Sequence, residues 1–146
     1  MIELIVVMMV IGILAVVVLP RFDLLKGFDE IGYRDKVKAT LEYARKSAVG
    51  QRRNVRVSLA GNSLTLSIDN VVPESASAGT YPRALALPAL DGACGGATNQ
   101  ICAPAGITLT GPATLTFSAL GRPSAAGTYT VTGATITVEA ETGYVH

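Results

Sequence analysis

Hydrophobic and polar positions divide the chain into three stretches, and the first is an unbroken apolar run. Residues 4–19 include no charged side chain and no side-chain hydrogen-bonding group. As a helix, sixteen residues rise about 24 Å, slightly less than the ~30 Å hydrocarbon core of a bilayer. Residues 1–3 bring the run close to a full span, so the pattern predicts a hydrophobic transmembrane helix over residues 1–22.

A cleaved secretory signal peptide is the alternative interpretation of this run. Such a peptide has a basic region before its apolar residues and a small-x-small cleavage site after them. The charged residue before the run is acidic, Glu3, and Pro20-Arg21-Phe22 is a poor cleavage site. A retained helix is therefore favoured. Pro20 can lie inside it as a kink, because a missing N–H is tolerated best near membrane depth.

The second stretch, residues 23–53, has the pattern of an amphipathic helix, because its apolar residues recur at spacings of three and four. They are Leu24, Phe28, Ile31, Val37, Leu41, Ala44 and Ala48. Gly27 and Gly32 lower the helix propensity of the first part, so we expect a bend or a loosely held turn there. The residues expected on the solvated face are Lys36, Lys38, Arg45 and Lys46.

The third stretch, residues 54–146, is β-rich. Apolar and polar residues alternate over residues 55–59 and 64–68 around the turn pair Gly61-Asn62, which predicts a β-hairpin. Further strand patterns cover residues 107–109, 115–117, 129–132 and 136–138. The expected fold is α+β: a long N-terminal helix, membrane-spanning and then amphipathic, packed on an antiparallel sheet through Leu41, Ala44 and Ala48.

A long irregular stretch rich in Ala, Pro and Gly, residues 70–105, separates the two groups of strands. Loops of this length in a compact domain are usually functional or held by a cross-link. The chain's two cysteines, Cys94 and Cys102, both lie in this stretch. They are either free thiols or a disulfide, and the export that the N-terminus suggests favours the disulfide.

The net charge of +1 is unevenly distributed along the chain. Residues 1–22 sum to zero, residues 23–56 hold nine Lys/Arg against five Asp/Glu, and residues 57–146 hold two against five. The basic excess therefore follows the apolar run, as it does at the flanks of membrane helices. A nucleic-acid-binding domain normally has a more strongly basic surface than this.

Motifs for catalysis and metal binding are missing from the sequence. The single histidine, His146, is the last residue, and there is no Cys/His cluster for zinc and no nucleophile elbow. The glycine-rich residues 91–96 lack the following Lys-Ser/Thr of a phosphate-binding loop. The sequence therefore predicts a protein that is not an enzyme and needs no cofactor.

The motif Ile-Glu-Leu-Ile-Val-Val at positions 2–7, the apolar run with Gly12, and Pro20 together form one recognisable pattern. It resembles the mature N-terminal segment of type IV pilins and pseudopilins. In the family pattern, Gly | Phe-Thr-Leu-Ile-Glu, the bar marks cleavage by prepilin peptidase, and Met1 has the place of the leucine. We expect the upstream DNA to encode, in frame, a short basic leader that ends in Gly followed by Phe-Thr or a close variant.

The β-rich part has features of one group within this family. Phe-Ser-Ala-Leu-Gly-Arg-Pro at positions 117–123 and Thr-Gly-Tyr-Val-His at positions 142–146 resemble the closing Gly-Arg elements of GspH/FimT-type minor pilins and pseudopilins. The final pair of strand patterns is also similar to that of a minor pilin of the mannose-sensitive haemagglutinin pilus. Some FimT-like proteins bind DNA through a Gly-Arg-x-Arg terminus. Here Gly143-Tyr-Val-His146 lacks both arginines, so DNA binding is in doubt.

The resemblance implies roles for three N-terminal residues. Glu3 would neutralise the N-terminal amine of a neighbouring subunit; alternatively, it is an interfacial residue that faces lipid headgroups. The helix between Gly12 and Pro20 would loosen when a subunit leaves the bilayer for the filament. Alternatively, Gly12 only permits close helix packing and Pro20 only kinks the helix.

Two classes of function follow from these observations. The first is a minor pilin or pseudopilin, held in the bacterial inner membrane with a periplasmic globular part. Its partners would be other pilin or pseudopilin subunits and, with a leader, prepilin peptidase. The second is a membrane-anchored periplasmic module whose strands and cysteine loop bind DNA or an adhesion ligand.

Overall fold

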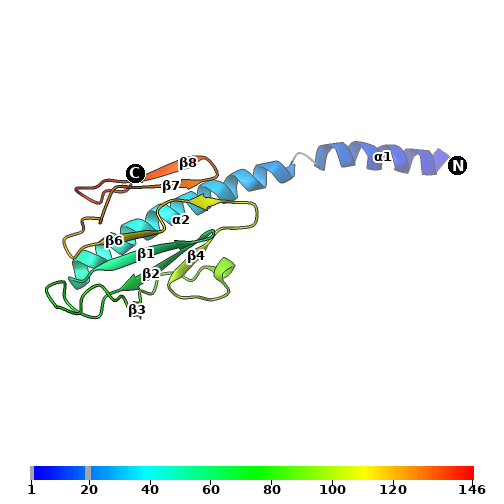
Figure 1. Ribbon diagram of the computed structural model, residues 1–146. Coiled ribbons are helices and arrows are strands. Elements are labelled where there is room, and N and C mark those ends of the chain that lie inside the picture. Colours follow the sequence, from blue (N-terminus) through cyan, green and yellow to red (C-terminus); the bar gives the residue numbers. More distant parts are fainter. Residues whose placement is uncertain (1, 19–20) are drawn as a thin grey trace. The chain divides into compact units, whose positions relative to one another are not determined.

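A computed structural model describes residues 2–18 and 21–146 of the chain (Figure 1). Contacts divide the chain into two compact units, Met1–Gly32 and Tyr33–His146. The first unit contains helix α1 (Ile2–Val18) and the beginning of helix α2 (Arg21–Gln51). The second contains the rest of α2 and all the strands, which form an α+β fold with antiparallel sheets, as the sequence predicts.

The buried face of α2 follows the helical spacing of the sequence. Val37, Leu41, Ala44 and Ala48 are all fully buried, and Tyr33 continues this face by one turn. The three residues expected to pack on the sheet, Leu41, Ala44 and Ala48, belong to the same apolar cluster as the strands. The prediction for this part of the helix is confirmed.

The beginning of α2 differs from the prediction. Phe28 and Ile31 continue the apolar spacing, but their side chains are 73% and 58% exposed. The strands all belong to the second unit, so no sheet covers these two residues within their own unit. Of the bend or loosely held turn expected at Gly27 and Gly32, the turn is wrong, because α2 is helical through both glycines. A glycine costs a helix only about 1 kcal/mol, which the surrounding helix-forming residues offset.

The predicted hairpin forms the centre of the first sheet. Strand β1 (Val55–Ala60) pairs with β2 (Ser63–Ile68) around a turn at Gly61-Asn62. Strand β6 (Thr114–Phe117) pairs with the other edge of β1. Alternate residues of β1 and β2 are buried, which places their apolar side chains on the face toward α2.

The stretch expected to be irregular contains two short strands and a turn of 3-10 helix. Strand β3 (Arg83–Ala84) pairs with the end of β2, and β4 (Gln100–Cys102) pairs with its beginning. The 3-10 helix η1 (Gly92–Cys94) precedes β4. The sheet order is β3-β2-β1-β6, and β4 also lies on β2.

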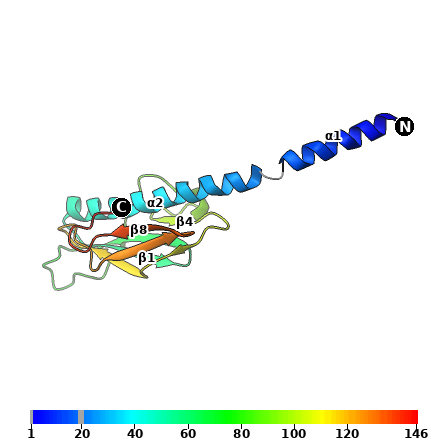
Figure 2. The same cartoon turned by 90° about the horizontal axis from the view of Figure 1, so that it is seen from above.

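A second sheet of three strands is built from the C-terminal part of the chain. Its order is β5 (Leu109–Thr110), β7 (Gly127–Val131) and β8 (Ala134–Val138). One face of this sheet is buried and belongs to the same apolar cluster as α2 and β1. Its residues are Tyr129, Val131, Ile136 and Val138. Figure 2 shows the second half of α2 lying along the strands of this unit, so one core serves both sheets.

Every member of this apolar cluster lies between Tyr33 and Val145. A chain that lacks residues 1 to about 24 therefore keeps the whole cluster, and we expect it to be a soluble, cooperatively folded monomer. Thermal unfolding followed by circular dichroism, together with light scattering, measures this. Aggregation or the loss of a cooperative transition would contradict it.

Candidate functional site

Helix α1 is apolar around its whole circumference apart from Glu3, and no other element of its own unit covers it. Residues 2–16 are all exposed, and twelve of them, between Ile2 and Val16, are large apolar residues. Contiguous apolar surfaces of this size mark sites of contact with other proteins or with membranes. Helix α1 is therefore the first candidate for a functional surface.

The structure places two of the three expected assembly residues on α1. Glu3 lies in its first turn, where a carboxylate interacts favourably with the helix dipole. Gly12 follows nine positions later, on the opposite side of the helix, and a side chain there would meet no atom within 4 Å. Pro20 lies outside the described residues. Of the helices in residues 2–18 and 21–146, none combines the length and apolarity needed to cross a membrane.

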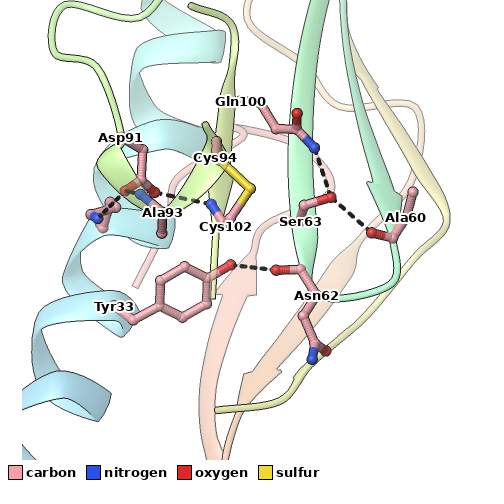
Figure 3. Close-up of a disulfide and its surroundings, with 10 residues drawn as sticks. Tyr33, Ala60, Asn62, Ser63, Asp91, Ala93, Cys94, Gln100 and Cys102 are labelled. Carbon is pink, nitrogen blue, oxygen red and sulfur yellow. Dashed lines mark hydrogen bonds and ion pairs between the residues drawn. A yellow bond between two sulfur atoms is a disulfide. The ribbon is translucent and has the colours of Figure 1, made fainter. Parts of the chain in front are cut away.

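The second candidate is the loop that the two cysteines close. Cys94 lies in η1 and Cys102 in β4, their Cα atoms are 5.3 Å apart, and their sulfur atoms are bonded (Figure 3). Because β4 pairs with β2, the disulfide attaches the loop to the first sheet. Its position is thus fixed by both a covalent bond and backbone pairing.

Asp91 organises this loop. Its side chain is only 6% exposed, and its carboxylate accepts hydrogen bonds from the backbone N–H of Ala93 and Cys102, at 3.2 and 2.9 Å (Figure 3). The Nζ of Lys36, from α2, lies 3.1 Å from the same carboxylate. Burial disfavours the charged form, but these hydrogen bonds and the charge of Lys36 outweigh it and hold the pKa of Asp91 below its usual value.

A buried tyrosine ties α2 to both sheets. The hydroxyl of Tyr33 donates to the backbone oxygen of Asn62 at 3.0 Å (Figure 3), and the side-chain oxygen of Asn62 accepts from Leu109 N–H at 3.1 Å. Burial, with a smaller contribution from the charge of Asp91, raises the pKa of Tyr33 to about 12. The hydroxyl therefore stays protonated and acts as a donor at physiological pH.

Two basic residues expected on the solvated face of α2 have other roles. Lys36 pairs with Asp91, as described above. Arg45 is half-buried: its side chain lies against Gly121 and Gly143, and its Nε is buried with no hydrogen-bond partner among the described residues. Lys36 is exposed as predicted, although it pairs with Asp91, whereas Arg45 departs from the prediction because loops distant in sequence lie against it.

Sequence reasoning missed Asp91, although a local pattern could have indicated it. An Asp followed by Gly92, at the start of a short helical turn, is a typical N-cap sequence, and the Asp91 side chain does accept from Ala93 N–H. Its contact with Lys36, 55 residues away, has no sequence pattern. The helical spacing of residues in α2 therefore could not have predicted the contact between this helix and the cysteine loop.

A cavity of about 250 Å³ lies beside this network, lined mainly by apolar atoms of α2 and the segment before Asp91. The charged groups at its wall, Lys36 and Asp91, already satisfy each other. In the described part of the chain, no three potential metal ligands come together. The cavity therefore presents little polar chemistry to a ligand.

The C-terminal residues present an aromatic and acidic surface. His146 lies 3.0 Å from a carboxylate oxygen of Glu139, and its ring stacks on Tyr144 with centroids 5.6 Å apart. Val145 is buried and bridges to Val138. The last four residues, Gly143-Tyr-Val-His146, themselves contribute no guanidinium group to contact phosphate.

Comparison with known proteins identifies the fold but no sequence family. No protein-family model and no curated protein matches the chain significantly. Among solved structures, the type IV minor pilin FimU of Pseudomonas aeruginosa is 20% identical, with a TM-score of 0.50, over 77% of this chain and 82% of that one. The minor pseudopilin EpsH, from the type 2 secretion system of Vibrio cholerae, is 12% identical, with a TM-score of 0.58, over 81% and 94%.

At these identities the likeness establishes the fold. The chain has the fold of minor type IV pilins and minor pseudopilins, a long N-terminal helix packed on antiparallel sheets. The resemblance read from the N-terminal residues is thus confirmed at the level of the fold.

The lowered pKa of Asp91 predicts a specific acid sensitivity. Its ionised form stabilises the folded state fully above about pH 4, the pKa in the unfolded chain, and this stabilisation is lost as the pH falls through the lower folded pKa. Asp91→Asn should cost about 1–3 kcal/mol at pH 7 and remove this part of the acid dependence. The measurement is urea unfolding between pH 7 and pH 2.5.

The matched control is Asp35→Asn, an exposed carboxylate on the same helix as Lys36. It should behave as the wild type at every pH. An equal loss of stability on acidification in the wild type and in Asp91→Asn would show that Asp91 does not carry the effect.

Proposed function

We propose that this protein is a minor pilin or pseudopilin, a structural subunit that assembles through its N-terminal helix into a pilus or a secretion-system pseudopilus. The observation that carries the proposal is the uncovered apolar helix α1, with one carboxylate in its first turn, joined to a unit with the minor-pilin fold. An apolar helix that its own unit leaves uncovered is suited to contacts with lipid and then with other subunits.

Glu3 has the central role in this proposal. A carboxylate at the end of an apolar helix is costly in a bilayer or a dry helix bundle unless it has a partner of opposite charge. The pilin resemblance supplies that partner, the N-terminal amine of a neighbouring subunit. Because Glu3 lies directly before the apolar run, this pairing would set the register between adjacent helices.

Gly12 and Pro20 have supporting roles in the same proposal. A glycine with open space around it lets another helix approach its backbone closely. Val16, Val17 and Val18, between these two residues, have low helix propensity, and Pro20 lacks an N–H. The segment 12–20 would therefore loosen most easily when the subunit moves from bilayer to filament.

The proposed location is the bacterial inner membrane, with the second unit in the periplasm and, after assembly, in a pilus or pseudopilus. The Cys94–Cys102 bond supports it, because structural disulfides form in oxidising compartments. Prepilin peptidase would process the chain if a leader precedes it. The partners are other pilin or pseudopilin subunits, and the minor pilins of the mannose-sensitive haemagglutinin pilus are one system to compare.

A ligand-binding module with a membrane anchor is less well supported. The cavity beside Lys36 is mainly apolar, and the C-terminal residues lack the arginines of the DNA-binding pattern. The proteins with this fold in the comparisons are described as a minor pilin and a minor pseudopilin, which supports a structural role over an enzymatic one.

The role of Glu3 is tested by Glu3→Ala. The substitution should leave membrane insertion intact or improved, because an apolar residue replaces an acid at the end of the helix. Recovery of the protein in sheared filaments, or with partner pilins, should fall at least about tenfold, because a buried amine loses its carboxylate. Co-purification is compared with the wild type at matched membrane levels.

Glu42→Ala is the control, because Glu42 lies on α2 and, among the described residues, its ion pair is with Lys46, at 3.7 Å on the surface. It should co-purify as the wild type does. Equal recovery of Glu3→Ala and the wild type would reject the assembly role of Glu3 and favour the anchored binding module.

A further inference from the structure

Tyr81 has a backbone conformation that its residue type and its neighbour both disfavour. Its φ is +49°, in the left-handed region that a residue with a bulky side chain seldom adopts. The next residue is Pro82, and a residue before proline is restricted further, toward extended conformations. Strain of this kind persists where the surrounding structure holds a residue in place, and it points to a role for the side chain.

The side chain of Tyr81 supports an arginine of the first sheet. The guanidinium carbon of Arg56, in β1, lies 3.9 Å from the centre of the Tyr81 ring, so the cation lies over the aromatic face. Arg56 alternates along β1 with the buried residues Val55 and Val57. Its side chain therefore lies on the face of the sheet opposite to the apolar cluster.

The charge of Arg56 is not neutralised within the described part of the chain. No ion pair there includes Arg56, and the strands of the first sheet contain no Asp or Glu. The guanidinium groups that donate hydrogen bonds to described residues are those of Arg53, Arg83 and Arg122. The guanidinium of Arg56 is thus held against Tyr81 with its N–H donors available to another molecule.

Hydroxyl-bearing residues surround Arg56 on this face. Ser67 of β2 and Thr116 of β6 are its direct cross-strand partners. The Cβ atoms of such partners lie about 4.5–5.5 Å apart, so both side chains lie next to that of Arg56. The next row across the sheet is Thr65, Ser58 and Thr114. We call the surface formed by these six residues the Arg56 face.

A cleft of about 400 Å³ extends the Arg56 face beyond Thr116. Asn54, two residues before Arg56 along the chain, lines this cleft together with Ser118 and Ser124. The two serine hydroxyls accept from backbone N–H groups at 3.2 and 3.3 Å, and so keep their own protons for donation. The other lining residues are Leu120, Arg122 and Pro123.

The chemistry of the Arg56 face argues against two common classes of ligand. A nucleic acid is bound by several cations along its phosphates. The strands of this sheet contain only Arg56 and Arg83, and Arg83 donates to Gln51. A protein partner needs apolar or aromatic side chains at the centre of the interface, whereas the neighbours of Arg56 on this face carry hydroxyl groups.

We propose that the Arg56 face binds an acidic polysaccharide, a chain of sugars that carry carboxylates. A carboxylate accepts two parallel hydrogen bonds from the guanidinium of Arg56, which Tyr81 holds in place. The sugar hydroxyls exchange hydrogen bonds with Ser67 and Thr116, because hydroxyl groups both donate and accept. The cleft beyond Thr116 takes the next sugar. This site goes beyond the proposed function, because it gives a subunit that assembles through α1 a glycan-binding surface on its first sheet.

Isothermal titration calorimetry of the full chain in nonionic detergent micelles tests the site. The probes are hexamers of galacturonate and of mannuronate, the methyl esters of both, hexaglutamate and a short single-stranded DNA. At least one uronate hexamer should bind. Its methyl ester, which lacks the charged carboxylates, should bind at least about tenfold more weakly.

Substitutions separate the guanidinium and the ring from the fold. Arg56→Gln should weaken binding of the uronate hexamer at least about tenfold, and Arg56→Lys, which keeps the charge without the fork, should have an intermediate effect. Tyr81→Gly suits the left-handed backbone, so its melting temperature should stay close to that of the parent while binding falls at least about fivefold. Tyr81→Phe keeps the ring and should bind as the parent does.

Arg34→Gln is the matched control, because it removes one charge at an exposed position of α2. It should bind the uronate hexamer as the parent does. Binding of neither uronate hexamer, or equal binding by Arg56→Gln and the parent, overturns the inference. Hexaglutamate or DNA binding as tightly as the uronate hexamers overturns the polysaccharide as the occupant.

The site and the assembly role of α1 are tested independently. Glu3→Ala should bind the uronate hexamer as the parent does, and Arg56→Gln should co-purify with sheared filaments as the parent does. Loss of glycan binding without loss of co-purification therefore concerns the Arg56 face alone. Loss of both in Arg56→Gln would show a general defect of the second unit and would overturn the specific role of Arg56.

Discussion

The packing of one face of α2 against both sheets is the interaction on which the rest of the second unit depends. Leu41 fills the space between helix and strands, while Ala44 and Ala48 let the helix backbone approach them closely. Burial of one side chain the size of leucine stabilises a fold by about 1.5–3 kcal/mol. With this face fixed, the register of β1 and β2 follows, because a shift of one residue would turn their apolar side chains to solvent.

The same packing explains how fold and candidate site are separated along the chain. The cluster of buried apolar residues begins at Tyr33, so α1 contributes no side chain to the core of the second unit. The apolar surface of α1 is therefore available for contacts with other molecules. Substitutions on that surface need not change the core of the second unit. Phe28 and Ile31 belong to this outward-facing set, although the sequence spacing groups them with the residues that pack inside.

Much of the fold could be predicted from local patterns. The helices, the hairpin at Gly61-Asn62 and the later strands follow hydrophobic periodicity, which depends on near neighbours. Strands β3 and β4 could not be predicted, because two or three residues show no periodicity and their pairing is decided by β2. The same limit applies to Lys36, whose partner is far away in sequence. Glu3 and Gly12 were found from a motif, and their roles stay predictions.

The outer edge of β2 is shared among several segments of the stretch between residues 70 and 105. Beyond its pairing with β3 and β4, Leu66 N–H donates to Asn99 O, and Leu66 O accepts from Leu85 N–H. Until that stretch has folded, β2 has an open edge that can pair with another chain. The Cys94–Cys102 bond joins η1 to β4 and so holds this loop together beside β2. The folded loop therefore keeps this edge of β2 covered and unavailable for pairing with another chain.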